Sequence, residues 1–129
     1  MKPKLTIAIP NYNGGENLRR AIRSCSTIDL NSDEFEILVI DNKSTDKSIE
    51  IVNELKIKIP NIKLWQNEKN VGRIQNWNIC LRKAKGDYLI LLFTNDLINE
   101  DNNISEVIKI LDDEYLELFN TKSFLGLLF

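Results

Sequence analysis

Residues 35–46, FEILVIDNKSTD, join an apolar run to a short polar turn. Apart from Glu36 the run is continuously apolar, which is typical of a strand buried on both faces of a parallel sheet. After the turn, Ile49, Val52 and Leu55 recur at the spacing of one face of a helix. A strand, a turn and an amphipathic helix in this order predict one unit of an α/β fold.

The same order of elements occurs three more times along the chain. Apolar runs at 5–9, 62–66 and 87–93 are each followed by apolar residues at helical spacing. We predict that Gly86 ends the helix before the last run, as its C′ residue. The sequence therefore predicts an α/β fold with an open, largely parallel sheet and flanking helices. The expected buried helix positions are Leu18, Ala21, Ile22 and Cys25; Ile74, Trp77, Leu81 and Ala84; and Ile104, Val107, Ile108 and Leu111.

Size and charge restrict the class of protein. The 129 residues have the length of one domain, and 17 Lys and Arg against 19 Asp and Glu give a net charge of −2. That balance lacks the basic footprint of a nucleic-acid binder, so we expect no nucleic-acid partner. Cys25 and Cys80 fall on predicted helix faces, where we expect free core thiols. Without a long apolar segment or a secretory leader, the sequence predicts a cytoplasmic protein.

Four polar loops follow the four predicted strands. Their sequences are PNYNGGEN, DNKSTD, NEKNVGR and TNDLINED, and they are rich in Asn and Asp. Right-handed crossovers place every loop of this kind at the carboxyl edge of a parallel sheet, where such folds bind ligands. We therefore expect the four loops to converge on one crevice.

Each loop has a binding interpretation and a plainer one. Asp41 either hydrogen-bonds a ribose or base, or caps the next helix together with Ser44. Tyr12 either stacks on a planar ring or covers loop backbone. Arg73 either meets a phosphate at a helix N-terminus or is solvated. Asp96 either binds a hard divalent cation or caps a helix.

The glycine patterns of two common nucleotide-binding loops are missing from the sequence. Neither G-x-G-x-x-G after the first strand nor G-x-x-x-x-G-K-[ST] anywhere in the chain is present. A dinucleotide-binding dehydrogenase domain and a P-loop protein are therefore poor interpretations of this α/β pattern.

Four segments together resemble the family 2 glycosyltransferases, which have the Rossmann-like GT-A fold. They are IPNYNGGENLRRAIRS, FEILVIDNKSTDKSIEIV, NEKNVGRIQNWN and AKGDYLILLFTNDLINED, and the resemblance extends over about residues 5–111. It implies metal-assisted transfer of a sugar from a nucleotide-diphosphate sugar to a hydroxyl of a glycan or lipid-linked saccharide. Because lipid-linked acceptors are frequent in the family, a peripheral location at the inner face of the membrane stays open.

The resemblance also implies which residues bind the donor. Tyr12 would lie against the base, Asp41 would read the base or ribose, and Asp96 would bind Mn²⁺ or Mg²⁺ through the diphosphate. Phe93 and Asn95 stand where many relatives have acids, so Asp96 would be the one carboxylate of the motif. The implied substrate-binding residues are Pro10, Asn11, Tyr12, Asp41, Asn70, Gly72, Arg73, Asn78, Asn95 and Asp96.

The resemblance covers the donor-binding half of a GT-A domain. We assign residues 1–112 to that half and leave 113–129 as an unassigned tail. The acceptor half, with the catalytic base, would be absent, which predicts a truncated GT-A domain. The alternative to a glycosyltransferase is therefore a truncated, non-catalytic nucleotide-binding module or remnant. We expect self-association through the apolar end of the tail, FLGLLF.

Overall fold

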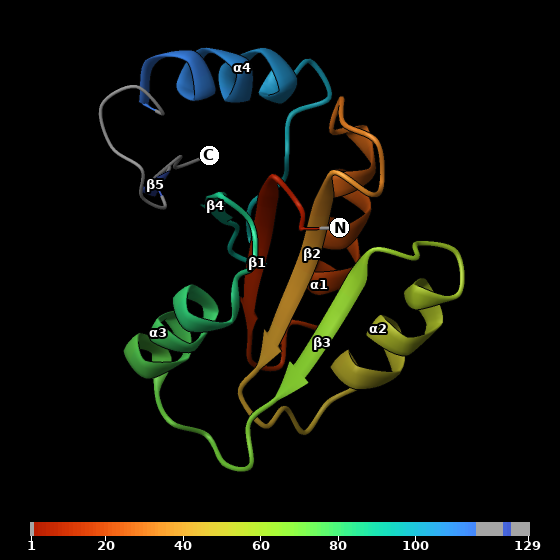
Figure 1. Ribbon diagram of the computed structural model, residues 1–129. Helices are drawn as coiled ribbons and strands as arrows, with labels where there is room; N and C mark the ends of the chain where they lie inside the picture. The colour runs from red at the N-terminus through yellow and green to blue at the C-terminus, as the bar shows by residue number, and fades with distance from the viewer. Residues whose placement is uncertain (1, 116–122, 125–129) are drawn as a thin grey trace.

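A computed structural model describes residues 2–115 and 123–124 of the chain (Figure 1). Strands and helices alternate from the N-terminus, as the sequence predicts. A short 3₁₀ helix, η1 (Cys25–Thr27), directly follows α1. In chain order the other elements are β1 (Leu5–Asn11), α1 (Gly15–Ser24), β2 (Phe35–Asp41), α2 (Ser48–Lys56), β3 (Ile62–Gln66), α3 (Arg73–Lys83), β4 (Tyr88–Leu91), α4 (Ile104–Tyr115) and β5 (Ser123–Phe124).

The strands form one parallel sheet in the order β3-β2-β1-β4-β5. Leu5 pairs with Phe35 on one side and with Tyr88 on the other, so β1 lies at the centre. The predicted α/β fold with a parallel, flanked sheet is confirmed. β5 lies within the stretch 113–129 that the sequence leaves unassigned, and pairs with β4. The other residues after 115, and with them the expected self-association through the tail, lie outside the described residues.

The two faces of the sheet are covered unequally. Alternate strand residues such as Ile7 and Val39 pack into a large core with α1, α2 and α4. Residues of opposite parity, such as Ala8 and Leu38, form a smaller cluster with Cys80, Ala84 and the partly buried Ile79 of the α3 segment. Among the described residues, one helix therefore covers the second face, and it does so at the carboxyl half of the strands (Figure 1).

The predicted inward face of α3 is wrong at two positions. Ile74 is 60% exposed and Leu81 is 43% exposed, whereas Asn76 and Cys80 are buried. Asn76 is drawn inward because its Nδ2 donates to the Ile40 carbonyl and its Oδ1 accepts from Asn67. A polar network at the strand ends thus rotates the helix away from its most apolar face.

Two smaller expectations also differ from the structure. On α2 the buried residues include Ile51, whereas Ile49 is half-buried. Gly86 is not a C′ residue, because α3 ends at Lys83 and its C-cap, Ala84, is extended. Gly86 is needed instead for close approach, since a Cβ there would lie 2.6 Å from the Thr6 nitrogen.

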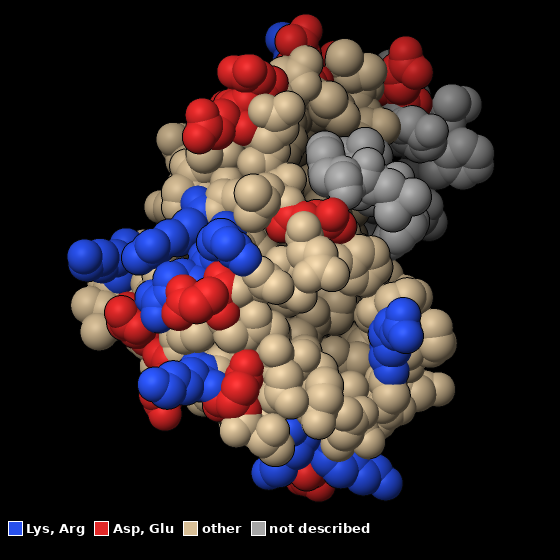
Figure 2. Space-filling view, turned by 180° about the vertical axis from the view of Figure 1, so that it is seen from behind, with Lys and Arg blue, Asp and Glu red and all other residues tan. Residues whose placement is uncertain are grey.

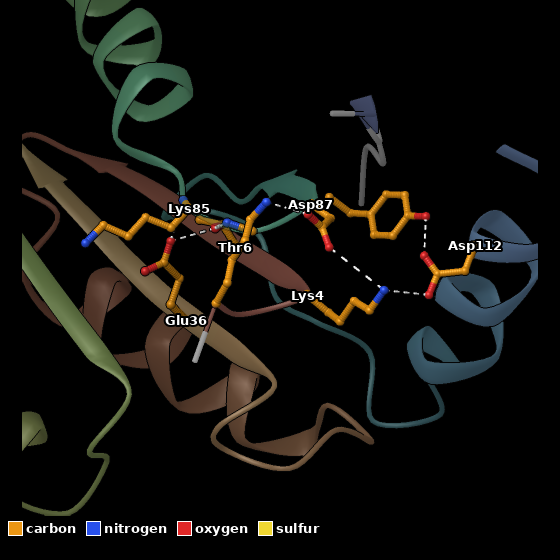
Figure 3. Close-up of polar contacts among 9 residues, drawn as sticks. Lys4, Thr6, Glu36, Lys85, Asp87 and Asp112 are labelled. Atoms are coloured by element: carbon orange, nitrogen blue, oxygen red, sulfur yellow. Dashed lines mark hydrogen bonds and ion pairs between the residues drawn. The ribbon is translucent and has the colours of Figure 1, made fainter. Parts of the chain in front are cut away.

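Two polar clusters fasten the amino-terminal end of the sheet (Figure 3). In one, Glu36 Oε1 accepts from Thr6 Oγ1 at 2.7 Å and from the Lys85 backbone nitrogen at 2.8 Å. The hydrogen bond from the Lys85 nitrogen fixes the turn between α3 and β4. In the other, Asp112 of α4 accepts from Lys4 Nζ at 2.8 Å and from the Tyr88 hydroxyl at 2.6 Å. The second cluster ties α4 to the centre of the sheet.

Charge is distributed unevenly between the two ends of the molecule. Figure 2 shows acidic side chains gathered at the end formed by α4 and the loop before it, and basic ones prevailing at the end where the strands finish. Both cysteines are buried and free, as predicted. Within the described chain, no helix has the length and apolar character needed to cross a membrane.

Candidate functional site

A pocket of about 630 Å³ opens at the carboxyl edge of the sheet. The loops after β1, β2, β3 and β4 reach it together with the first turn of α3, so the predicted convergence of the four loops is observed. Its lining residues are Pro10, Asn11, Tyr12, Asn42, Asn70, Arg73, Asn76, Trp77, Phe93, Thr94, Asn95 and Asp96.

Asp41 lies behind the lining of this pocket. Its side chain is 2% exposed, with Oδ1 accepting from Asn11 Nδ2 at 2.8 Å and from Ser44 Oγ at 2.6 Å. Oδ2 accepts from the Ser44 backbone nitrogen at 2.9 Å. The carboxylate therefore joins the first two loops and orients Asn11, which does face the pocket. It caps no helix, because α2 begins only at Ser48, whose nitrogen bonds Asp46.

The first loop is folded tightly against the second. Asn13 has a φ of 53°, and its Oδ1 accepts from the backbone nitrogens of Thr45 and Asp46. Gly14 donates its backbone N–H to Asn11 Oδ1, and a Cβ at this position would collide with that oxygen. The loop therefore leaves Tyr12 half out in solvent, 52% exposed, at the rim of the pocket.

Four asparagines form a hydrogen-bonded cluster along the β2 and β3 side of the pocket. Asn42 donates to Asn70 Oδ1 at 2.9 Å, and Asn67 donates to Asn42 Oδ1 at 3.0 Å and to Asn76 Oδ1 at 2.7 Å. Gly72, with a φ of 86°, closes the loop and begins α3 as its N-cap. We call Asn42, Asn67, Asn70 and Asn76 the amide cluster.

Two charged side chains line the pocket, one basic and one acidic, and neither has a partner within the described part of the chain. Arg73, in the first turn of α3, and Asp96, after β4, both line it. Neither side chain forms a hydrogen bond or an ion pair with any other residue in the described part of the chain. Both charges therefore remain available to a ligand.

Two aromatic side chains, Trp77 and Phe93, also line the pocket. The Trp77 and Phe93 rings pack with their centroids 5.3 Å apart and a 52° angle between their planes. Tilted packing of this kind is a favoured aromatic arrangement. Phe93 stands where the resemblance predicts an acid, and the structure gives it a partner on α3 instead.

Seven of the ten predicted binding residues line the pocket, and three do not. Asp41 lies behind it, and Gly72 and Asn78 are not among the lining residues. The sequence interpretation missed Asn42, Asn76, Trp77 and Thr94. Asn42 had a visible signal, because it directly follows Asp41 at the end of a buried strand. Asn76 and Trp77 had none, since helical periodicity favoured Trp77 as core and left Asn76 on the outer face.

The profile of "Glycosyl transferase family 2" matches residues 6–122. The chain belongs to this family. The match extends past residue 111, where the resemblance read from the sequence stops. The sheet and the flanking helices of the chain form a GT-A-like fold.

Among relatives, an uncharacterized glycosyltransferase of Haemophilus influenzae is 38% identical over 99 residues, which are 77% of this chain and 39% of the relative. The crystal structure of Staphylococcus aureus TarS residues 1–349 with UDP-GlcNAc matches with a TM-score of 0.76 and 28% identity, covering 85% of this chain and 31% of that 1–349 chain. GalNAc-T7, solved with UDP, GalNAc and Mn²⁺, matches with a TM-score of 0.63 and 27% identity, over 72% of this chain and 18% of that one. This chain thus spans about two-fifths or less of these relatives.

The donor set of the pocket fits a divalent cation that a ligand helps to hold. No group of three His, Cys, Asp or Glu side chains among residues 2–115 could bind a metal alone. Mg²⁺ sites often use one or two carboxylates and complete their coordination with phosphate oxygens and water. Asp96 supplies one free carboxylate in the pocket, so a cation here would need further oxygen ligands from outside the protein.

Proposed function

We propose that this family 2 chain binds a nucleotide-diphosphate sugar and serves as the donor half of a sugar transfer to an acceptor hydroxyl. The observation that carries this proposal is the pair of unpartnered charges, Arg73 and Asp96, in one pocket. A diphosphate with a bound divalent cation offers the charges that both would pair with. The family match and the UDP-GlcNAc complex of TarS support a nucleotide-sugar as the ligand.

Different residues of the pocket would bind different parts of the nucleotide-sugar. Tyr12 supports the base by stacking at the rim. Both N–H groups of Asn11 are bonded to Asp41 and Ser44, so it offers the nucleoside only the remaining lone pair of its Oδ1. Arg73 pairs with the diphosphate at the first turn of α3, where backbone N–H groups also face an anion. Asp96 would hold Mn²⁺ or Mg²⁺, and the cation would stabilise the negative charge of the departing diphosphate.

A second candidate is a nucleotide-binding module that transfers no sugar. It needs only the pocket and its two unpartnered charges, and we identify no catalytic base among the pocket residues. A glycan or lipid-linked saccharide as acceptor belongs to the transferase proposal alone.

Titration calorimetry tests the shared part of both candidates. We expect a nucleoside diphosphate to bind with a tighter Kd in the presence of Mn²⁺ than in its absence. If no nucleoside diphosphate binds with or without metal, the donor-site proposal fails. A radiolabelled-sugar transfer assay then separates the candidates, because turnover by the purified chain supports the enzyme and binding without turnover supports the module.

We also propose a cytoplasmic location. Two buried free thiols fit a reducing compartment, where disulfides are rare. Fractionation of expressing cells tests this, and recovery in a salt-washable membrane fraction would instead indicate peripheral association.

A further inference from the structure

The loop of residues 68–72 is fastened to the sheet through a single side chain. Its residues are exposed or half-buried, and they contribute little apolar packing. Within the described chain, the hydrogen bonds that join this loop to the end of β2 all end on Asn42. Asn42 itself is 3% exposed, so its amide is held rigidly between the strand ends and the loop.

The hydrogen-bonding capacity of the Asn42 side chain is fully used. Its Nδ2 donates to Asn70 Oδ1 at 2.9 Å and, more weakly, to the Gly72 carbonyl at 3.4 Å. Its Oδ1 accepts from the Val71 nitrogen at 2.9 Å and from Asn67 Nδ2 at 3.0 Å. A primary amide has two N–H donors and two acceptor lone pairs. Asn42 therefore has nothing left to offer a ligand, although it lines the pocket.

Only an amide satisfies both sides of this arrangement. A carboxylate at position 42 would keep the acceptor for Val71 but would place negative oxygen against Asn70 Oδ1 and the Gly72 carbonyl. Asn70 cannot simply turn its amide around, because its Oδ1 also accepts from the Gly72 nitrogen at 2.8 Å. An Asn42→Asp exchange therefore removes two donors and creates two repulsive contacts at nearly constant volume.

Resting on the proposed function, we infer that Asn42 is a positioning residue for diphosphate binding. By fixing Val71 and Gly72 it sets where α3 begins, and thereby where Arg73 enters the pocket. Asn67 donates both to Asn42 and to Asn76 of α3, and these hydrogen bonds link Asn42 to the helix. Asn42 thus positions the phosphate-binding residue while its own amide is fully engaged with protein groups.

Hydrogen exchange tests the positioning itself and needs no ligand. In the unmodified chain we expect the Val71 amide to be protected by its bond to Asn42. In Asn42→Asp the carboxylate repels Asn70 Oδ1 and the Gly72 carbonyl and thereby pushes the loop away from its acceptor, so we expect the Val71 amide to exchange at least about tenfold faster. Amides at the centre of the sheet, such as Ile7, should keep their protection. Unchanged exchange at Val71 would overturn the inference.

Nucleotide binding tests the consequence for Arg73. We expect Asn42→Asp to weaken nucleoside diphosphate binding by about tenfold or more and to change binding of the matching nucleoside by less than about threefold. The readout is the gain in affinity that the phosphates add to the nucleoside, because a purely structural defect would weaken binding of both ligands. Asn42→Ala, which brings no negative charge into the pocket, should lose the same gain, and a loss confined to Asn42→Asp would indicate direct repulsion and overturn the inference.

Thr6→Val is the matched control. It removes two buried hydrogen bonds, to Glu36 and from Gly86, at the opposite end of the same sheet. We expect it to lower stability while leaving both affinities in place. An equal loss of the diphosphate increment in Thr6→Val would show that general destabilisation is responsible and would overturn the inference. If the unmodified chain binds no nucleotide, the proposed function fails, and the exchange experiment still decides the role of Asn42.

Discussion

Asp96 has the simplest role to test at the scale of single residues. Its carboxylate lines the pocket without a protein partner, and one carboxylate gives a cation little affinity unless phosphate oxygens complete the site. Metal and nucleotide should therefore bind cooperatively, each raising the affinity for the other by the same factor.

We predict that Asp96→Asn removes the effect of Mn²⁺ on nucleoside diphosphate binding and does not weaken metal-free binding, because it also removes a negative charge beside the diphosphate. Calorimetric titrations with and without Mn²⁺ measure both quantities. Asn95→Asp is the complementary variant, because it adds a second carboxylate beside Asp96, and it should strengthen the metal-dependent part by about tenfold or more. A retained Mn²⁺ effect in Asp96→Asn would remove Asp96 from the metal site.

Arg73 gives a second prediction at this scale. Its guanidinium lines the pocket and is unpaired, so it meets the diphosphate without first breaking an ion pair. Arg73→Gln should weaken nucleoside diphosphate binding by about 10- to 100-fold, since a hydrogen bond to a charged group contributes about 1.5–3 kcal/mol. Arg82→Gln, an exposed position on the same helix, is the control and should leave the Kd unchanged. Equal effects of the two exchanges would indicate unspecific electrostatics.

Helix α3 shows, at the scale of elements, where sequence reasoning stops. Its existence follows from periodicity, although it ends earlier than Gly86 predicted, and the strands before and after it lie within the predicted apolar runs. The face that it buries does not follow, because two asparagines with specific partners outweigh the apolar stripe. Amide geometry of this kind depends on which strand ends lie side by side, and local sequence does not contain that information.

The exposed side of α3 predicts an unusual tolerance. Ile74 is 60% exposed, so Ile74→Gln should change the free energy of unfolding by less than about 0.5 kcal/mol. Ile22→Ala, in the fully buried face of α1, should cost about 2–5 kcal/mol. Urea denaturation monitored by circular dichroism measures both. A large loss in Ile74→Gln would show that this side of the helix is covered in solution.

Helix α4 depends on a carboxylate for its attachment. Burial of Asp112 acts to raise its pKa, but hydrogen bonds from Lys4 and Tyr88 outweigh burial and hold the pKa below its usual 3.8. A lowered pKa means that the charged form is the one the fold stabilises. The contribution is therefore complete above the usual pKa and is lost as the pH falls through the lower, folded-state pKa.

We predict that the stability difference between the unmodified chain and Asp112→Asn is constant at neutral pH and shrinks below about pH 4. Denaturant unfolding at a series of pH values gives the difference directly, and other carboxylates cancel because both proteins contain them. A difference that grows on acidification would contradict the assigned pKa direction.

At the scale of the whole molecule, the fold was more predictable than the site. The alternation of four apolar runs with four helices predicts a parallel sheet. In a parallel sheet the loops that follow the strands lie at its carboxyl edge. Seven pocket residues followed from that logic and the family resemblance. The roles of Asp41 and Asn42 did not, because each side chain turns inward to bond a loop that is distant in sequence.

The unequal cover of the two sheet faces leads to a prediction about opening of the whole fold. Cys25, the first residue of η1, packs into the large core, and Cys80 lies on the buried side of α3, the one described helix packed on its face of the sheet. Burial raises the pKa of both thiols to about 12, so neither should react with a thiol reagent at pH 8 unless the structure opens. Regions with few apolar contacts open at lower free energy than the global unfolding transition.

Cys80 should therefore be modified faster than Cys25 in the native state. We expect single-cysteine variants, Cys25→Ala and Cys80→Ala, to separate the two rates when labelled with a chromogenic disulfide reagent. Low concentrations of urea should accelerate Cys25 more steeply than Cys80, because exposing Cys25 requires the larger core to open and more surface to become exposed. In fully denaturing urea the two rates should converge. Equal rates and equal urea dependence in the native state would mean that both faces open together, and that α3 does not move apart from the rest of the sheet.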